Sequence, residues 1–172
     1  MYSPTYSING HLLNTVSEAC DLGVVVDNSL KFDKHISLIV HKAQQRAGLI
    51  LKCFCSRDRH LLMKAFCTYV RPLFEFSTPV WSPHYQYLIF KIEKVQRAYT
   101  KRLTGMKNLK YLERIKALGI LSLDRRRLQR DLILSYNLFH GICEIHLPFK
   151  LCVSVTCGNS CKLVKTSCNT NK

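Results

Sequence analysis

Apolar residues recur at intervals of three and four along most of this chain, and this periodicity is compatible with few folds. It is clearest after Phe32, where six apolar residues would share one side of a helix: Ile36, Ile39, Val40, Ala43, Ala47 and Ile50. Such spacing brings every member to the same face, so it predicts an amphipathic helix with one buried side. Helices of this kind bury their apolar stripes against one another, which favours a helical bundle.

Further segments carry the same helical pattern. The segment after Asp58 is predicted to bury Leu62, Ala65, Phe66, Tyr69, Val70 and Leu73. Pro72 cannot continue a helix without the loss of a hydrogen bond, so this helix should bend or end near Arg71. Prolines two residues before and after Trp81 predict a turn in which Trp81 is a packing anchor.

Three more helices are predicted in the second half. One covers 85–103 and should bury Ile89, Ile92, Val95, Tyr99 and Leu103. A short helix over 109–118 should end at Gly119, because glycine readily takes the left-handed conformation that follows many helices. The last covers 123–139, with Ser122 as its N-cap. Its expected core side comprises Leu128, Leu132, Tyr136 and Phe139.

The first 27 residues have an extended pattern instead. Asn9-Gly10 suits the positive φ angles of a tight turn and predicts a β-hairpin there. The β-branched run from Asp21 to Asp27 predicts a single strand that ends in a turn after Asp27. The predicted fold class is therefore mainly α, in three parts: an N-terminal β-hairpin over 1–30, a helical bundle over 31–146 and an irregular tail over 147–172.

The sequence offers no constellation for catalysis or metal binding. Asp21 and Asp27 would share a strand face but lie about 20 Å apart, too far to hold one metal site together. The tail offers a single cysteine pair at zinc-like spacing, whereas a structural zinc site needs two pairs. Its cysteines are Cys152, Cys157, Cys161 and Cys168. We therefore predict free thiols, no catalytic residue, no metal, no cofactor in this chain and no small-molecule substrate.

Nothing in the sequence predicts export or membrane insertion. The segment Met1–Pro4 lacks the basic and apolar regions of a secretory signal. No apolar run approaches the roughly 20 residues that cross a bilayer. We expect an intracellular protein of the nucleus or cytoplasm, without a membrane partner and with its nine cysteines reduced.

Positive charge is concentrated in one quarter of the chain. The whole sequence has 26 Lys and Arg against 11 Asp and Glu, which gives a net charge of +15. Residues 89–130 contain 13 of these cations and three acids, a net charge of +10. Such a segment favours a polyanionic partner, and nucleic acid is the first candidate. An acidic protein or an anionic membrane surface is the alternative.

Two clusters of cations are the candidate binding residues. The first follows the predicted third helix and its end: Lys91, Lys94, Arg97, Lys101 and Arg102. The second opens the last helix: Arg125, Arg126 and Arg127. The free N–H groups of a helix N-terminus favour a phosphate beside these arginines. The alternative is that the first cluster is only solvated, and that the arginines are solvated or pair with Asp124 and Asp131.

Five short blocks stand in a fixed order along the chain. They are Asp21–Phe32 with His35-Ile36, Val70–Phe76, Val80–Pro83, Ile92–Arg97 with Thr100-Lys101, and Tyr111–Ile115 with Leu118, Leu121–Leu123, Arg125-Arg126, Asp131-Leu132 and Gly141. In this order they resemble the segment after the polymerase palm of LINE-type, jockey-like non-LTR retrotransposon reverse transcriptases. The resemblance covers nearly the whole chain.

The resemblance implies the end of the palm followed by the helical thumb, the part that grips the RNA template and the growing DNA. In this family the fingers and palm, with paired aspartates that use Mg²⁺, lie upstream. The chain is therefore expected not to polymerise DNA by itself. Its implied partners are the RNA–DNA template–primer hybrid and the missing fingers and palm. The alternative is a stand-alone basic helical module that binds nucleic acid and has no enzymatic parentage.

One run departs from the family pattern. Members often carry Thr-Arg-Gly-His near their end, where this sequence has Thr156-Cys157-Gly158-Asn159. An arginine-to-cysteine change requires a single base, so a decaying copy of an element is our hypothesis for this departure.

Overall fold

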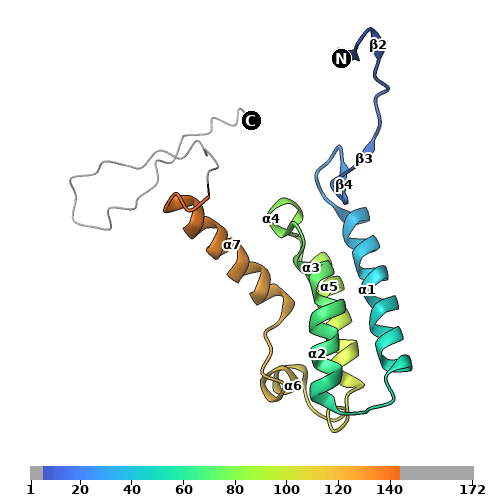
Figure 1. The fold of residues 1–172 in the computed structure, drawn as a ribbon, viewed down its shortest axis with the longest axis vertical. Helices are drawn as coiled ribbons and strands as arrows, with labels where there is room; N and C mark the ends of the chain where they lie inside the picture. Colours follow the sequence, from blue (N-terminus) through green and yellow to red (C-terminus); the bar gives the residue numbers. More distant parts are fainter. Residues whose placement is uncertain (1–5, 144–172) are drawn as a thin grey trace, which may run out of the picture. The chain divides into compact units, whose positions relative to one another are not determined.

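The computed structural model describes residues 6–143 (Figure 1). Its elements in chain order are β1 (Ser7–Ile8), β2 (His11–Leu12), β3 (Glu18–Asp21), β4 (Val24–Asp27), α1 (Asp33–Cys53), α2 (Arg59–Tyr69), α3 (Arg71–Glu75), α4 (Thr78–Trp81), α5 (Gln86–Lys101), α6 (Tyr111–Ala117) and α7 (Leu123–Phe139). The protein is mainly helical with β-hairpin structure at its N-terminal end, which confirms the predicted fold class. The predicted tail, with its four cysteines and the run Thr156–Asn159, lies outside the described residues.

The chain divides into two units, one ending at Asp131 and the other beginning at Leu132. Helix α7 begins in the first unit and ends in the second. The packing and the site described below belong to the first unit. The sequence-based boundaries at residues 30 and 146 stay predictions.

The first hairpin has the predicted turn. β1 pairs with β2 in antiparallel register, with Ile8 opposite His11. Asn9 and Gly10 between them have φ angles of 51° and 78°. Asparagine and glycine tolerate this left-handed backbone best, so the local sequence sets the turn.

The segment Asp21–Asp27 is a second hairpin, so the prediction of a single strand is wrong. Leu22 and Gly23 have φ angles of 44° and 84°, and the chain reverses there. Asp21 pairs with Val24 across the turn, whereas Asp27 pairs with Glu18 at the other end of the hairpin. Glycine in the left-handed region lets a β-branched run fold back on itself.

Asp27 holds the connection between this hairpin and α1. Its carboxylate accepts hydrogen bonds from the backbone N–H groups of Ser29 at 2.9 Å, Lys31 at 3.3 Å and Phe32 at 2.9 Å, and from the Ser29 hydroxyl. The Ser29 hydroxyl and these N–H groups stabilise the charged form and lower the pKa of Asp27 to about 2. Asp27 is thus the last residue of β4 and holds the turn that follows, where the sequence predicted the strand to end.

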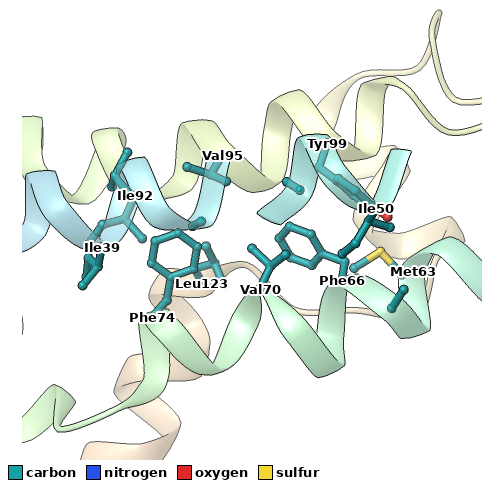
Figure 2. Packing of buried hydrophobic residues seen from close by; sticks show 14 of the residues in the cluster. Ile39, Ile50, Met63, Phe66, Val70, Phe74, Ile92, Val95, Tyr99 and Leu123 are labelled. Atoms are coloured by element: carbon teal, nitrogen blue, oxygen red, sulfur yellow. The ribbon is translucent and has the colours of Figure 1, made fainter. Parts of the chain in front are cut away.

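The core lies between α1, α2 and α5, which run side by side (Figure 1). All six predicted apolar residues of α1 are buried. Phe66 and Val70 point from the α2 side toward Val95 and Tyr99 of α5 (Figure 2). The Phe66 and Tyr99 rings lie 4.6 Å apart between centroids. The Tyr99 hydroxyl donates to the Leu62 carbonyl at 2.7 Å, which satisfies its only polar group inside this core.

The predicted break near Arg71 is confirmed. The Asp58 side chain caps the start of α2 by accepting from the Leu61 N–H at 2.9 Å. Helix α2 ends at Tyr69, and α3 begins at Arg71 with Pro72 in its first turn. A proline is tolerated there because the N–H it lacks would have no partner in the helix.

Trp81 is the predicted packing anchor, although the turn around it is the short helix α4. Its side chain is 1% exposed, and its Nε1–H donates to the Phe76 carbonyl at 2.7 Å. The His35 ring meets it edge-on at 5.3 Å. The His35 Nδ1 in turn accepts from the Val25 N–H at 3.3 Å, so this imidazole joins the second hairpin to the helices.

Several predicted core positions are exposed. Tyr69 lies outside the buried side of α2, which is rotated toward Met63, and Ile89 is only half-buried while Leu88 is buried. The expected core side of α7 is wrong throughout, because Leu128, Leu132, Tyr136 and Phe139 are exposed. Leu123 and Arg127 are buried there instead. Acidic groups of α3 and of α7 itself pair with the arginines of this helix.

Over residues 6–143, no helix combines the length and the apolar character needed to cross a membrane.

Candidate nucleic-acid interface

The cations predicted along the third helix lie together on the exposed side of α5. Lys94, Arg97 and Lys101 follow one another at intervals of three and four residues, so they share one helix face. Lys91 stands beside this row, and Arg102 directly follows the helix. All five side chains are exposed. We call these five residues the α5 cation row.

Arg97 is the cation of this row whose position is best defined. Its guanidinium lies over the Tyr111 ring at 4.7 Å and near the Phe90 ring at 5.4 Å, measured to the ring centroids. A guanidinium within cation–π distance of two aromatic rings gives up little further freedom when it binds a phosphate. Lys91 is also tethered, since its Nζ donates to the Ser37 hydroxyl of α1 at 2.7 Å.

One turn before Arg97, at the edge of the buried side, α5 carries a buried acid that sequence reasoning missed. Glu93 is 6% exposed and accepts from the Leu123 N–H at 3.0 Å and the Asp124 N–H at 3.4 Å. The Tyr111 hydroxyl donates to the same carboxylate. Burial and this bond to Glu93 raise the pKa of Tyr111 far above its usual value. The sequence signal that could have found it is an acidic residue among the predicted buried residues of this helix.

Glu93 changes the interpretation of the N-terminus of α7. A phosphate was expected near the first N–H groups of this helix. The structure places the Glu93 carboxylate there, where it balances the positive end of the helix dipole. Ser122 is also present as the predicted cap, since its hydroxyl accepts from the Arg125 N–H at 3.3 Å.

The three arginines of the second cluster are not equivalent. Arg126 donates to Glu75, and Arg130 donates to the other oxygen of that carboxylate at 2.7 Å. Arg127 is 3% exposed and pairs with Asp124 at 3.3 Å, the partner named in the alternative interpretation. Arg125 is exposed. Arg126 and Arg127 thus serve the protein interior, and Arg125 is the member of this cluster that is open to a ligand.

Glu75 is the centre of this ion-pair cluster, which also includes Arg71 at 3.3 Å. Burial would raise the pKa of Glu75, but the hydrogen bond and charge of Arg126, with Arg130 and Arg71, outweigh it and lower the pKa. A carboxylate that is 9% exposed stays charged because three guanidinium groups surround it.

Arg114 of α6 holds the C-terminal part of α5 in place. Its guanidinium donates to the Arg97 carbonyl at 3.3 Å, the Leu109 carbonyl at 2.7 Å and the Thr100 hydroxyl at 3.2 Å. Arg114 is 7% exposed, so this cation is a structural element and not part of the surface. One of these acceptors, the carbonyl of Arg97, belongs to a member of the α5 cation row.

Within residues 6–143, no three histidine, cysteine or acidic side chains come together in a way that could hold a metal ion.

Comparison with known proteins gives one informative similarity. A Caenorhabditis elegans protein described as uncharacterized protein B0403.1 is 28% identical over 131 residues, which cover 74% of this chain and 65% of that protein. The chain thus spans less than two thirds of the length of that relative. No family model and no solved structure matches the chain.

Proposed function

We propose that this chain is the basic helical, thumb-like part of a non-LTR retrotransposon reverse transcriptase, and that it holds the RNA–DNA template–primer hybrid while chemistry occurs elsewhere. The observation that carries the proposal is the α5 cation row, a contiguous exposed face in which Arg97 is fixed by two rings. The proposed setting is the nucleus or cytoplasm, where the missing fingers and palm would act.

Residues of the resembling blocks support the proposal from inside the fold. Asp27 holds the turn before α1, and His35 and Trp81 pack against each other. Glu93 and Arg114 join α5 to α7 and α6. Each of these polar side chains has a defined internal partner. The blocks therefore supply internal contacts of the fold that presents the α5 cation row.

The mechanism is neutralisation of phosphate charge. Lys94, Arg97 and Lys101 extend over about 10 Å of helix, at 1.5 Å per residue. Each phosphate they neutralise releases condensed counterions, so affinity should fall steeply with salt and depend little on base sequence. Binding of this kind suits a polymerase thumb, which must hold any template.

The test is the salt dependence of binding to a blunt RNA–DNA hybrid, followed by fluorescence anisotropy. Replacement of Lys94, Arg97 and Lys101 by alanine should lower the slope of log K against log salt by about 2 to 3, at about 0.9 per phosphate contact. The matched control replaces Lys42, Lys52 and Lys64, three exposed lysines of α1 and α2, and removes the same charge. Equal slopes for both triple variants would overturn the proposal.

A stand-alone nucleic-acid-binding module is the second candidate. The observation that favours it is that the residues up to Asp131 form one unit with its own core. Both candidates use the same surface. They differ in whether a fingers-and-palm fragment supplied separately binds this chain, which a pull-down with purified fragments decides.

A further inference from the structure

Three exposed aromatic residues continue the α5 cation row toward the start of the helix. Tyr87 and Phe90 precede Lys94, Arg97 and Lys101 at intervals of three and four residues, so all five share one face of α5. Tyr85 stands at the N-cap position, and its ring lies 5.8 Å from that of Tyr87. The exposed fractions of these aromatic side chains are 49% for Tyr85 and 56% for both Tyr87 and Phe90.

The rings are held in place rather than free. The Tyr87 hydroxyl donates to the Asp33 carboxylate of α1 at 2.7 Å. The Tyr85 and Tyr87 rings are inclined by 32°, close enough to parallel to offer adjoining flat faces. Phe90 is next to the Arg97 guanidinium at 5.4 Å. This fixed, exposed aromatic surface costs little entropy to organise when a flat ligand stacks on it.

The arrangement divides one helix face into a cationic half and an aromatic half. Cations contact phosphates whether or not the bases are paired. Aromatic rings stack only on bases whose faces are free, as in single strands. A nucleic acid that satisfies both halves therefore carries phosphates along Lys94–Lys101 and unpaired bases beside Tyr85–Phe90.

From this juxtaposition we infer that α5 recognises the junction between a duplex and a single strand, with unpaired bases stacked on Tyr85, Tyr87 and Phe90. The inference rests on the proposed function and deepens it, because it names the form of nucleic acid that the surface prefers. The dense positive charge beside the rings argues for a polyanion that also has flat apolar faces, which nucleic acid is.

The experiment compares three ligands of equal phosphate number: a blunt RNA–DNA hybrid, a hybrid with a single-stranded extension, and the same hybrid with an abasic extension. The hybrid whose extension carries bases should bind about tenfold more tightly than the other two ligands. This factor corresponds to stacking of one to two bases. If the abasic extension binds as tightly as the complete one, the inference is overturned.

Variants assign the effect to the rings. Tyr85→Ala with Tyr87→Ala should abolish the preference for the extension and leave binding to the blunt hybrid unchanged. Phe90→Ala should reduce the preference in part, while Tyr111 still holds Arg97. Tyr69→Ala, which removes an equally exposed ring from the end of α2, should leave it intact. Loss of the preference in Tyr69→Ala would also overturn the inference.

The two proposals fail in different ways. A chain that binds the blunt hybrid but shows no preference for the extension retains the proposed function and loses this inference. A chain that binds only free single strands, through the three rings, retains stacking and loses the template–primer function. Displacement of every hybrid by polyglutamate at equal charge concentration would indicate an acidic protein partner and overturn both.

Discussion

The Glu93 carboxylate of α5 accepts a hydrogen bond from the Leu123 N–H at 3.0 Å, and so a side chain from one helix caps another. The two residues are 30 positions apart in sequence. The contact fixes the first turn of α7 against the buried side of α5. It also occupies N–H groups at the start of α7 that would otherwise be free to attract an external anion.

Replacement of Glu93 by glutamine tests this cap. The amide retains an acceptor but loses the charge that opposes the helix dipole, so the free energy of unfolding should fall by about 1 to 2 kcal/mol. Tyr111→Phe removes the hydroxyl that donates to Glu93 and accepts from the Gln96 amide at 2.9 Å, but it leaves the capping carboxylate in place and should cost less. Urea denaturation followed by circular dichroism measures both. A larger loss in Tyr111→Phe would contradict this account of the cap.

Glu75 provides a second stability test. Glu75→Gln leaves Arg71, Arg126 and Arg130 without their shared carboxylate, and about 2 kcal/mol of stability should be lost, allowing for the partial exposure of the arginines. The control is Glu18→Gln, which breaks the more exposed pair with Lys34 and should cost less than about 1 kcal/mol. Similar losses in the two variants would show that burial is unimportant at Glu75.

Glu75 should also make the stability of the protein depend on pH in the acidic range. The pKa of Glu75 is lowered in the folded state, so its contribution is complete above the unfolded value of 4.5 and is lost as the pH falls through the folded value. Glu75→Gln should therefore flatten the decline of stability below pH 4.5. Denaturation midpoints of both proteins across this range provide the measurement.

His35 should make the stability of the protein decline at a less acidic pH than Glu75 does. Burial, with a smaller effect of Lys42, lowers the pKa of His35 below 6.5 in the folded state. The unfolded chain takes up the proton first, so stability should be complete above pH 6.5 and decrease as the pH falls through the folded value. His35→Gln retains an acceptor for the Val25 N–H and should weaken this decline. His41→Gln, at an exposed site on the same helix, should not.

Replacement by alanine should change the stability of the protein in opposite directions at two glycines. Gly23 has a φ of 84°, which a side chain tolerates poorly, so Gly23→Ala should lower stability by about 1 kcal/mol. Gly48 lies within α1 with open space where a Cβ would be, so Gly48→Ala should raise stability by about 0.5 to 1 kcal/mol. Thermal unfolding of both variants gives the signs, and equal signs would contradict the backbone argument.

Much of the helical fold was predictable because local pattern and burial agree. The stripe of α1, the break before Pro72 and the N-cap at Ser122 follow from side-chain chemistry over a few residues. The second hairpin was missed because a β-branched run outweighed the single Leu22-Gly23 turn. Local pattern predicts a fold best where neighbouring residues decide it.

The candidate site was only partly predictable for a related reason. Exposure of the α5 cation row follows from helical spacing within one segment. The pairing of Arg126 with Glu75 joins residues 51 positions apart, and the capping of α7 by Glu93 also depends on tertiary contacts. Spacing cannot indicate which cations such contacts remove from the surface.

Trp81 gives this protein an internal optical reporter. It is the single tryptophan of the chain and meets the His35 ring at 5.3 Å. An excited indole transfers an electron to a protonated imidazole far more readily than to a neutral one, so the emission of Trp81 should dim when His35 gains its proton. Emission wavelength would then follow solvent entry into the core, and emission intensity would follow a proton on one imidazole, in the unlabelled natural chain.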